Sequence, residues 1–273
     1  MTAKLLIAGN IAKDVTADGW RPGGGAFYAA AQAYKLGAEV TVFTACSGDI
    51  EPATLLPQVD WRVQPSDSST TFENKYKDGH RSQRLLSKGA PIALELLPEI
   101  DVILLTPVFH EIAPDSVASL AASGAVLGVS AQGWLRELDG ERVRPTKFET
   151  DPPWLRGDVV FLSEEDIQDT GAVGSWRARV PIVALTRGRD GCTVWDSEGR
   201  HDVSTASVRE LDPTGAGDIF AAAFLLHFYE ARDVLSSARF AAAAAALSVR
   251  GEGIGALAGR DEIEALLSTV KVA

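Results

Sequence analysis

The chain has 273 residues, a formal charge of −11 and an apolar content of 46%. This length and composition allow one large α/β domain with a small appendage, or two domains, around a sizeable core. The acidic balance argues against a nucleic-acid or anionic-membrane partner, because both need a basic surface. No apolar run reaches the length of about 18 residues that a membrane span needs. Cys46 and Cys192 have no zinc-type spacing, so we expect buried free thiols in a reducing, cytoplasmic compartment.

Short apolar runs alternate with helical patterns along most of the chain. Alternating strands and helices predict an α/β fold with a mostly parallel sheet covered on both faces. The predicted elements are strands at 4–8, 40–45, 102–106, 125–129, 159–162 and 182–186, helices at 26–36 and 114–122, a hairpin at 192–195 and 201–203, and helices from 216 onward.

The segment 60–88 breaks this rhythm. It has little helical periodicity and is rich in Thr, Ser, Lys and Arg. Residues 70–76 and 81–86 predict two strands joined through Asp78-Gly79. We therefore expect a small sheet that projects from the main domain, with a disordered polar loop as the alternative.

The sequence LDPTGAGDIFAAAF, residues 211–224, carries the clearest chemical signal. A Gly-Ala-Gly turn that opens a helix leaves backbone N–H groups pointing one way, and these form an anion site at the positive end of the helix dipole. Asp218, in the first helical turn, is placed to take a proton from a hydroxyl beside the bound anion. This combination is what phosphoryl transfer to an alcohol requires. The alternative is that Asp212 and Asp218 only cap a buried helix.

This segment resembles the C-terminal signature of the PfkB (ribokinase-like) carbohydrate kinases. The resemblance implies that Asp218 is the catalytic base and that the backbone of Gly215, Ala216 and Gly217 is the anion hole. It also implies one ribokinase-like domain over residues 1–273, with a three-layer α/β/α fold. Residues 60–88, with part of 11–22, would form a small β lid over the sugar.

On the acceptor side, the glycines Gly23 and Gly24 open a helix that ends in Leu-Gly, which resembles the N-terminal PfkB signature. The family's glycines lie against the sugar. Tyr28 stands where the family usually has an Asn, so we expect a differently shaped pocket. Asp14 follows the first strand, where open α/β sheets bind ligands, and its carboxylate can accept two hydrogen bonds from a vicinal diol. The resemblance implies that Asp14 grips sugar hydroxyls, and Asn10 is a weaker candidate of the same kind.

Gln132 and Arg136 follow another predicted strand and have side chains that can reach polyol or phosphate oxygens; surface decoration is the alternative. This segment, with TTFENKY and GHRSQRL in the expected lid, looks like the inositol kinase branch of the family. That likeness favours myo-inositol as the acceptor.

On the donor side there is no P-loop sequence, so ATP would bind in another way. The resemblance places the family's Asn-x-x-Glu segment at 163–166, where Asp166 would hold Mg²⁺ through water; a helix-capping sequence is the equal alternative. Glycines at 251–255 match a region that flanks adenine and, in some members, a K⁺ site. The implied cofactors are ATP and Mg²⁺, with K⁺ as a candidate. The implied ATP contacts are Ser163, Thr186, Arg187, Gly188, Gly191, Gly215, Gly217 and Gly253.

The sequence thus predicts an ATP-dependent kinase acting on a hydroxyl of a small polyol or sugar. Ribose, fructose, 2-keto-3-deoxygluconate and adenosine are alternative acceptors. A nucleotide- or sugar-binding sensor that has lost catalysis is a rival, supported by Tyr28 and the altered segment 163–166. A Rossmann dehydrogenase is disfavoured, because the glycine cluster lacks the G-x-G-x-x-G pattern. We expect a cytoplasmic monomer or homodimer.

Overall fold

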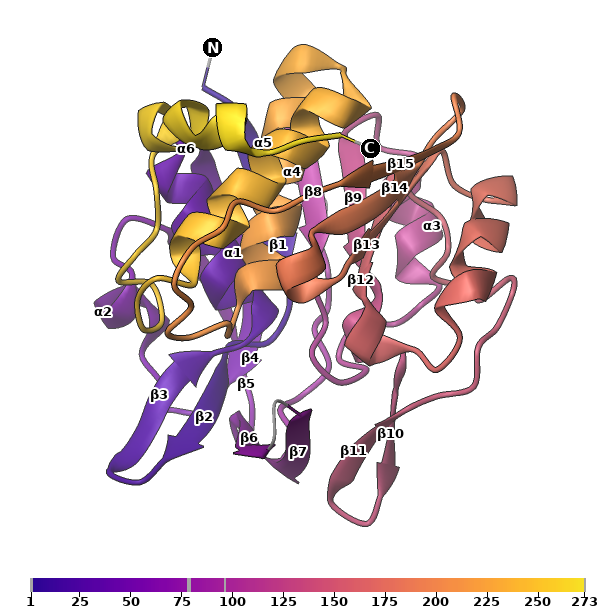
Figure 1. The fold of residues 1–273 in the computed structure, drawn as a ribbon. Helices are drawn as coiled ribbons and strands as arrows, with labels where there is room; N and C mark the ends of the chain where they lie inside the picture. Colours follow the sequence, from indigo (N-terminus) through magenta and orange to yellow (C-terminus); the bar gives the residue numbers. More distant parts are fainter. Residues whose placement is uncertain (1, 78–79, 96, 273) are drawn as a thin grey trace.

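Two β-sheets organise the fold, as the computed structural model shows for residues 2–77, 80–95 and 97–272 (Figure 1). The larger sheet has nine strands in the order β15-β14-β13-β12-β9-β8-β1-β4-β5. In this order, each pair of neighbours between β13 and β5 is parallel. Strand β14 is antiparallel to both of its neighbours, β13 and β15. They are β1 (Lys4–Ala8), β4 (Glu39–Cys46), β5 (Asp60–Pro65), β8 (Val102–Leu105), β9 (Val126–Ser130), β12 (Val159–Ser163), β13 (Ile182–Thr186), β14 (Cys192–Trp195) and β15 (Arg200–Val203).

Helices cover both faces of this sheet, because side chains alternate along each strand. In β1, Leu5 and Ile7 belong to one apolar core, while Leu6 and Ala8 belong to the other. The three-layer α/β/α fold with a mostly parallel sheet is therefore confirmed. One face carries the helices α1 (Gly25–Lys35), α4 (Ala216–Ala231), α5 (Val234–Ser248) and α6 (Arg260–Leu266). The other face carries α3 (Ser116–Ala121) and 3-10 turns at 170–178. The short helix α2 (Pro52–Leu55) precedes β5.

The central helix of the first layer is α4. Every residue from Ile219 to Leu226 is buried, which explains the unbroken apolar stretch in the sequence. It packs against α1 and α5 and reaches the sheet at β8, β9 and β12. No helix in the part of the chain that the structure describes is long and apolar enough to cross a membrane.

The second sheet has six strands in the order β10-β11-β7-β6-β2-β3 and lies at one end of the large sheet (Figure 1). Three separate parts of the chain build it. Residues 60–65, which we expected in this sheet, instead form β5 at the edge of the large sheet. The Asp78-Gly79 turn lies outside the described residues. The strands are β2 (Ala12–Thr16), β3 (Gly19–Gly23), β6 (Thr70–Lys77), β7 (His80–Ser87), β10 (Arg136–Asp139) and β11 (Arg142–Pro145).

Candidate active site

The carboxyl ends of the parallel strands meet at one edge of the large sheet, where open α/β sheets bind ligands. Asn10 follows β1, Thr106 follows β8 and Gln132 follows β9. Ser163 and Thr186 are the last residues of β12 and β13 and are register partners. The fold therefore brings together the ends that we expected to bear acceptor and donor contacts.

The turn at the start of α4 is built on Gly215. Gly215 has φ +80°, and a Cβ there would lie 2.3 Å from Cγ of the buried Tyr28 ring. Both the left-handed backbone and the ring therefore require glycine. A Cβ on Gly217, in contrast, would have no atom within 4 Å, so the turn is open on that side. The Ala216 N–H, which we expected in the anion hole, donates to the Pro213 carbonyl at 3.2 Å. The next N–H groups, of Gly217 and Asp218, lie in the first turn of α4, where N–H groups have no intrahelical partners and can meet an anion.

Asp218 lies where α4, α1 and β8 meet. Its Oδ1 accepts a hydrogen bond from the Thr106 hydroxyl over 3.1 Å. Gly25, the first residue of α1, allows this approach, because a Cβ on it would lie 1.9 Å from Thr106 Oγ1 and 2.5 Å from Asp218 Oδ1. The carboxylate is thus held at the strand ends, beside the open turn.

Asp212 joins the Gly215–Gly217 turn to two other segments. Its carboxylate accepts hydrogen bonds from the backbone N–H groups of Thr214 and Gly253, at 3.0 and 3.3 Å, and from Arg21 Nη1 at 2.7 Å. Burial opposes ionisation, but these partners outweigh it and lower the pKa of Asp212. Arg21 also donates from Nη2 to Thr214 Oγ1 at 3.0 Å. Sequence reasoning missed Arg21, which lies on β3, 191 positions from Asp212.

Asp14 lies on β2 and is buried. Strand β3 is next to β2 on one side, and β6 and then β7 follow on the other. Asp14 Oδ1 accepts a hydrogen bond from Asn74 Nδ2 at 2.9 Å, and Gln83 Nε2 donates to Asn74 Oδ1 at 2.8 Å. Gly23 leaves room for this carboxylate, since a Cβ there would lie 2.4 Å from Asp14 Oδ2. Sequence reasoning did not single out Asn74, although it is the register partner of Gln83 in the two strands that it predicted.

Tyr28 lies among the charged groups of the site. Its side chain is 1% exposed, and its hydroxyl has no hydrogen-bond partner among the described residues. Burial and then the negative charge of Asp14 raise the pKa of Tyr28, while Arg21 acts in the opposite direction. The phenol is therefore a neutral donor at physiological pH.

Two predicted acceptor contacts have protein partners. Asn10 Oδ1 accepts from the Ala45 N–H at 2.8 Å, and its Nδ2 donates to the Ala90 carbonyl at 3.1 Å. Arg136 is buried and donates to the Val108 carbonyl at 2.8 Å, with its guanidinium 5.6 Å from the centre of the Phe72 ring. In this structure both side chains tie strand ends and loops together.

The segment after β12 forms a helix cap. Ser163 Oγ accepts from the Glu165 N–H at 3.3 Å, and Asp166 Oδ2 accepts from the Ser163 N–H at 2.8 Å. Asp166 Oδ1 accepts from Gln132 Nε2 at 3.2 Å. Both Asp166 oxygens therefore have protein donors, and the water-mediated contact of Asp166 with Mg²⁺ stays a prediction. Within the described ranges, no group of three or more His, Cys, Asp or Glu side chains could hold a metal ion.

The turn after β13 is fixed by two glycines with positive φ, Gly188 and Gly191. A Cβ on Gly191 would lie 2.1 Å from the Val203 carbonyl oxygen. Thr186 Oγ1 donates to the Leu162 carbonyl at 3.3 Å, and Arg187 contacts Asp202 at 3.3 Å. The turn is thus tightly held beside β12, and Arg187 faces β15.

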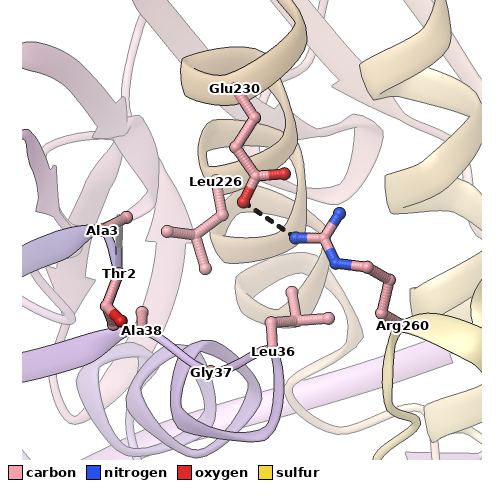
Figure 2. A pocket seen from close by; sticks show the side chains of 8 residues that line it. All are labelled: Thr2, Ala3, Leu36, Gly37, Ala38, Leu226, Glu230 and Arg260. Carbon is pink, nitrogen blue, oxygen red and sulfur yellow. Dashed lines mark hydrogen bonds and ion pairs between the residues drawn. The ribbon is translucent and has the colours of Figure 1, made fainter.

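A pocket of about 330 Å³ lies away from this site, near the other end of α4 (Figure 2). Leu36, Leu226 and the ion pair of Glu230 with Arg260 line it, and the ion pair spans 2.8 Å. Asp218 and the Gly215–Gly217 turn are not among the residues that line it.

Comparison with known proteins agrees with this geometry. Residues 158–258 match the family described as pfkB family carbohydrate kinase. The chain is 31% identical over 179 residues to ribokinase of Bacillus subtilis (strain 168), a match that covers 64% of this chain and 58% of that protein. It is 33% identical over 157 residues to inositol 3-kinase of Oryza sativa subsp. japonica, covering 54% and 39%. The chain is thus similar to PfkB carbohydrate kinases, most directly over residues 158–258. The matches span less than two thirds of these PfkB relatives.

Solved structures of ribokinase-like proteins share the fold. A pyrophosphate-dependent kinase in the ribokinase family, complexed with a pyrophosphate analog and myo-inositol, has a TM-score of 0.81 at 24% identity, covering 96% of this chain and 99% of that one. Arabidopsis thaliana ribokinase complexed with ribose and ATP has a TM-score of 0.74 at 20% identity, covering 98% and 99%. At these identities the likeness concerns the fold alone.

Proposed function

We propose that this protein transfers a phosphoryl group to a hydroxyl of a small polyol or sugar, with ATP as donor and myo-inositol as the favoured acceptor. The observation that carries the proposal is the position of Asp218. Its carboxylate lies in the first turn of α4, beside the open side of the Gly215–Gly217 turn and against Thr106. A base and an anion site thus adjoin, as phosphoryl transfer to an alcohol requires.

The acceptor would lie between the second sheet and the start of α4. Asp14 accepts hydrogen bonds from two of its hydroxyls, and Tyr28, with an unpartnered hydroxyl, donates one. Asp218 takes the proton of the attacking hydroxyl as its oxygen bonds to phosphorus. The bond between phosphorus and the leaving oxygen of the donor breaks in the same transfer.

The α4 turn stabilises the transferred group. Its backbone N–H groups and the helix dipole offset the charge that spreads over the phosphoryl oxygens. Strands β6 and β7 supply Asn74 and Gln83, which reach Asp14, so we propose that these strands with β2 and β3 form the lid that excludes water. Mg²⁺ would enter with the donor phosphates and offset their charge.

Myo-inositol as acceptor rests on chemistry and on relatives. A ring that bears only hydroxyls needs several convergent polar groups, and Asp14, Tyr28 and the Asn74–Gln83 pair are of this kind. Inositol 3-kinases are among the relatives, and a neighbouring structure contains myo-inositol.

A second candidate donor is inorganic pyrophosphate. Two structures of a pyrophosphate-dependent kinase have TM-scores of 0.81 to this chain. Pyrophosphate needs only the phosphate part of a donor site, and the turn of α4 supplies such a part without an adenine pocket.

Turnover on a matrix of substrates tests the proposal. Myo-inositol, ribose, fructose, 2-keto-3-deoxygluconate and adenosine would each be combined with ATP or pyrophosphate, and the phosphorylated acceptor would be measured directly. We expect the highest kcat/KM for myo-inositol with ATP. A higher kcat/KM for another acceptor would overturn the assignment of myo-inositol. Turnover with pyrophosphate but not with ATP would overturn the assignment of ATP as the donor. Binding without turnover in every combination would support the sensor instead.

A further inference from the structure

We propose that Arg21 is a further catalytic residue, whose guanidinium contacts the phosphoryl group as it is transferred. The inference rests on the proposed function, but it comes from contacts that neither the sequence motifs nor the family signature contains. Arg21 lies on β3, in the second sheet, and it reaches the loop that leads into α4.

The position of Arg21 is fixed at both ends. Its backbone is the register partner of Asp14 in the antiparallel pair of β2 and β3, so the two side chains start on the same face of the sheet. Its Nη1 donates to Asp212 at 2.7 Å and its Nη2 to Thr214 Oγ1 at 3.0 Å. Thr214 immediately precedes Gly215, so the guanidinium lies between the proposed acceptor residue and the anion turn.

The guanidinium keeps donors for a ligand. It carries five N–H groups in a planar fork, and the two contacts to Asp212 and Thr214 leave others available. The Arg21 side chain is 34% exposed, while Asp212 is 9% exposed. The pair is therefore buried on the Asp212 side and open on the other.

A second observation points to a ligand at the same place. The Tyr28 ring packs on Gly215, its hydroxyl has no partner among the described residues, and the side chain is 1% exposed. A buried hydroxyl without a partner is costly, so it is expected to find one in a bound molecule. Arg21 donates to Thr214, the residue before Gly215, so both donors lie at the same turn.

The charge of the site makes the arginine necessary. Asp14, Asp212 and Asp218 contribute three carboxylates, and a phosphoryl donor adds further negative charge. The α4 dipole offers only a fraction of a positive charge. Arg21 supplies a full one, and its fork matches phosphate oxygens.

The test uses the full chain and compares three variants. Arg21→Gln removes the charge, and Arg21→Lys keeps the charge and a pair with Asp212 but loses the fork. Arg260→Gln is the matched control, because Arg260 also forms a 2.8 Å ion pair, is 36% exposed, and lies near the far end of α4 (Figure 2). Urea unfolding of each variant shows whether it is folded before any other measurement.

Two readouts are measured. The first is the affinity for inorganic pyrophosphate by isothermal titration calorimetry, without acceptor. A charge-assisted hydrogen bond corresponds to about 10–100-fold in affinity, so Arg21→Gln should weaken binding by that factor. The second is kcat with the best acceptor, which should fall by about 10²–10³-fold, as for other donors to a transition-state oxyanion. Arg21→Lys should lie between, and Arg260→Gln should match the wild type.

A double variant separates contact from support. If Arg21 contacts the phosphoryl group, Arg21→Gln combined with Asp212→Asn should turn over more slowly than Asp212→Asn alone. Equal turnover of these two would show that Arg21 acts only through Asp212 and would overturn the proposal. So would equal pyrophosphate affinity of wild type and Arg21→Gln, or no binding by either. If the wild type phosphorylates no acceptor, the proposed function fails, and the affinity measurement still decides the role of Arg21 at the anion site.

Discussion

Substitution of Gly215 by Ala tests the geometry of the catalytic turn. A left-handed backbone costs a residue with a Cβ about 1–2 kcal/mol. In addition, the new Cβ would lie 2.3 Å from Cγ of Tyr28. The ring is 1% exposed and has little room to move, so this overpacking should cost about 1–3 kcal/mol more. We therefore expect Gly215→Ala to lower the free energy of unfolding by about 2–5 kcal/mol.

Gly37→Ala is the matched control for this substitution. Gly37 follows α1 with φ +89°, and a Cβ on it would have no atom within 4 Å. It should lose only the backbone cost of about 1–2 kcal/mol. Urea unfolding followed by tryptophan fluorescence measures both variants, and the difference between them isolates the contact with Tyr28. Equal losses in the two variants would refute the packing of Tyr28 against the turn.

Three further predictions concern the turn, the second sheet and pH. Gly217→Ala should stay folded, since its Cβ meets no atom within 4 Å, but it should lose turnover because the methyl group enters the proposed phosphoryl space; unchanged kcat would contradict this. Asn74→Asp places a carboxylate against Asp14 and should raise the KM for the acceptor more than it lowers kcat, and an unchanged KM would argue against the lid. Burial of Asp49 opposes its ionisation, but hydrogen bonds from Lys13, Ser47 and Ser69 lower its pKa to about 2. The ionised carboxylate should therefore stabilise the fold above pH 4, and this stabilisation should be lost as the pH falls from 4 to 2. The Tm difference between wild type and Asp49→Asn should therefore shrink over that range.

The sequence predicted the elements whose patterns are local. The apolar stretch Ile219–Leu226 is the buried part of α4, and the runs at 4–8 and 182–186 are β1 and β13. The pattern of residues 12–23 did not itself predict strands, because Gly19 and Pro22 are typical strand breakers and Trp20 is exposed. Only the family resemblance placed part of 11–22 in the small sheet, where β2 and β3 lie. Strand β5 was misplaced in the small sheet, because an exposed edge strand has no continuous apolar run.

The residues of the candidate site also differ in whether a local sequence pattern predicts them. Asp218 and its turn could be predicted because a short stretch of sequence contains both the glycines and the base. Arg21 could not, since its partner Asp212 lies 191 positions away and no local pattern encodes their contact. Asp166 shows the opposite case: one short sequence fits both a helix cap and an outer metal contact, and only the hydrogen bonds from Ser163 and Gln132 reveal the cap.

The most direct test of the account is the turnover of Asp218→Asn. The substitution keeps the size of the side chain and removes the base, with Asp261→Asn, in the first turn of α6, as the control for charge near a helix start. At saturating donor and with the best acceptor, kcat should fall by about 10²–10⁴-fold in Asp218→Asn, with little change in acceptor KM or in the urea midpoint. Turnover of Asp218→Asn close to that of the wild type would contradict the assignment of Asp218 as the base, and with it the proposed mechanism.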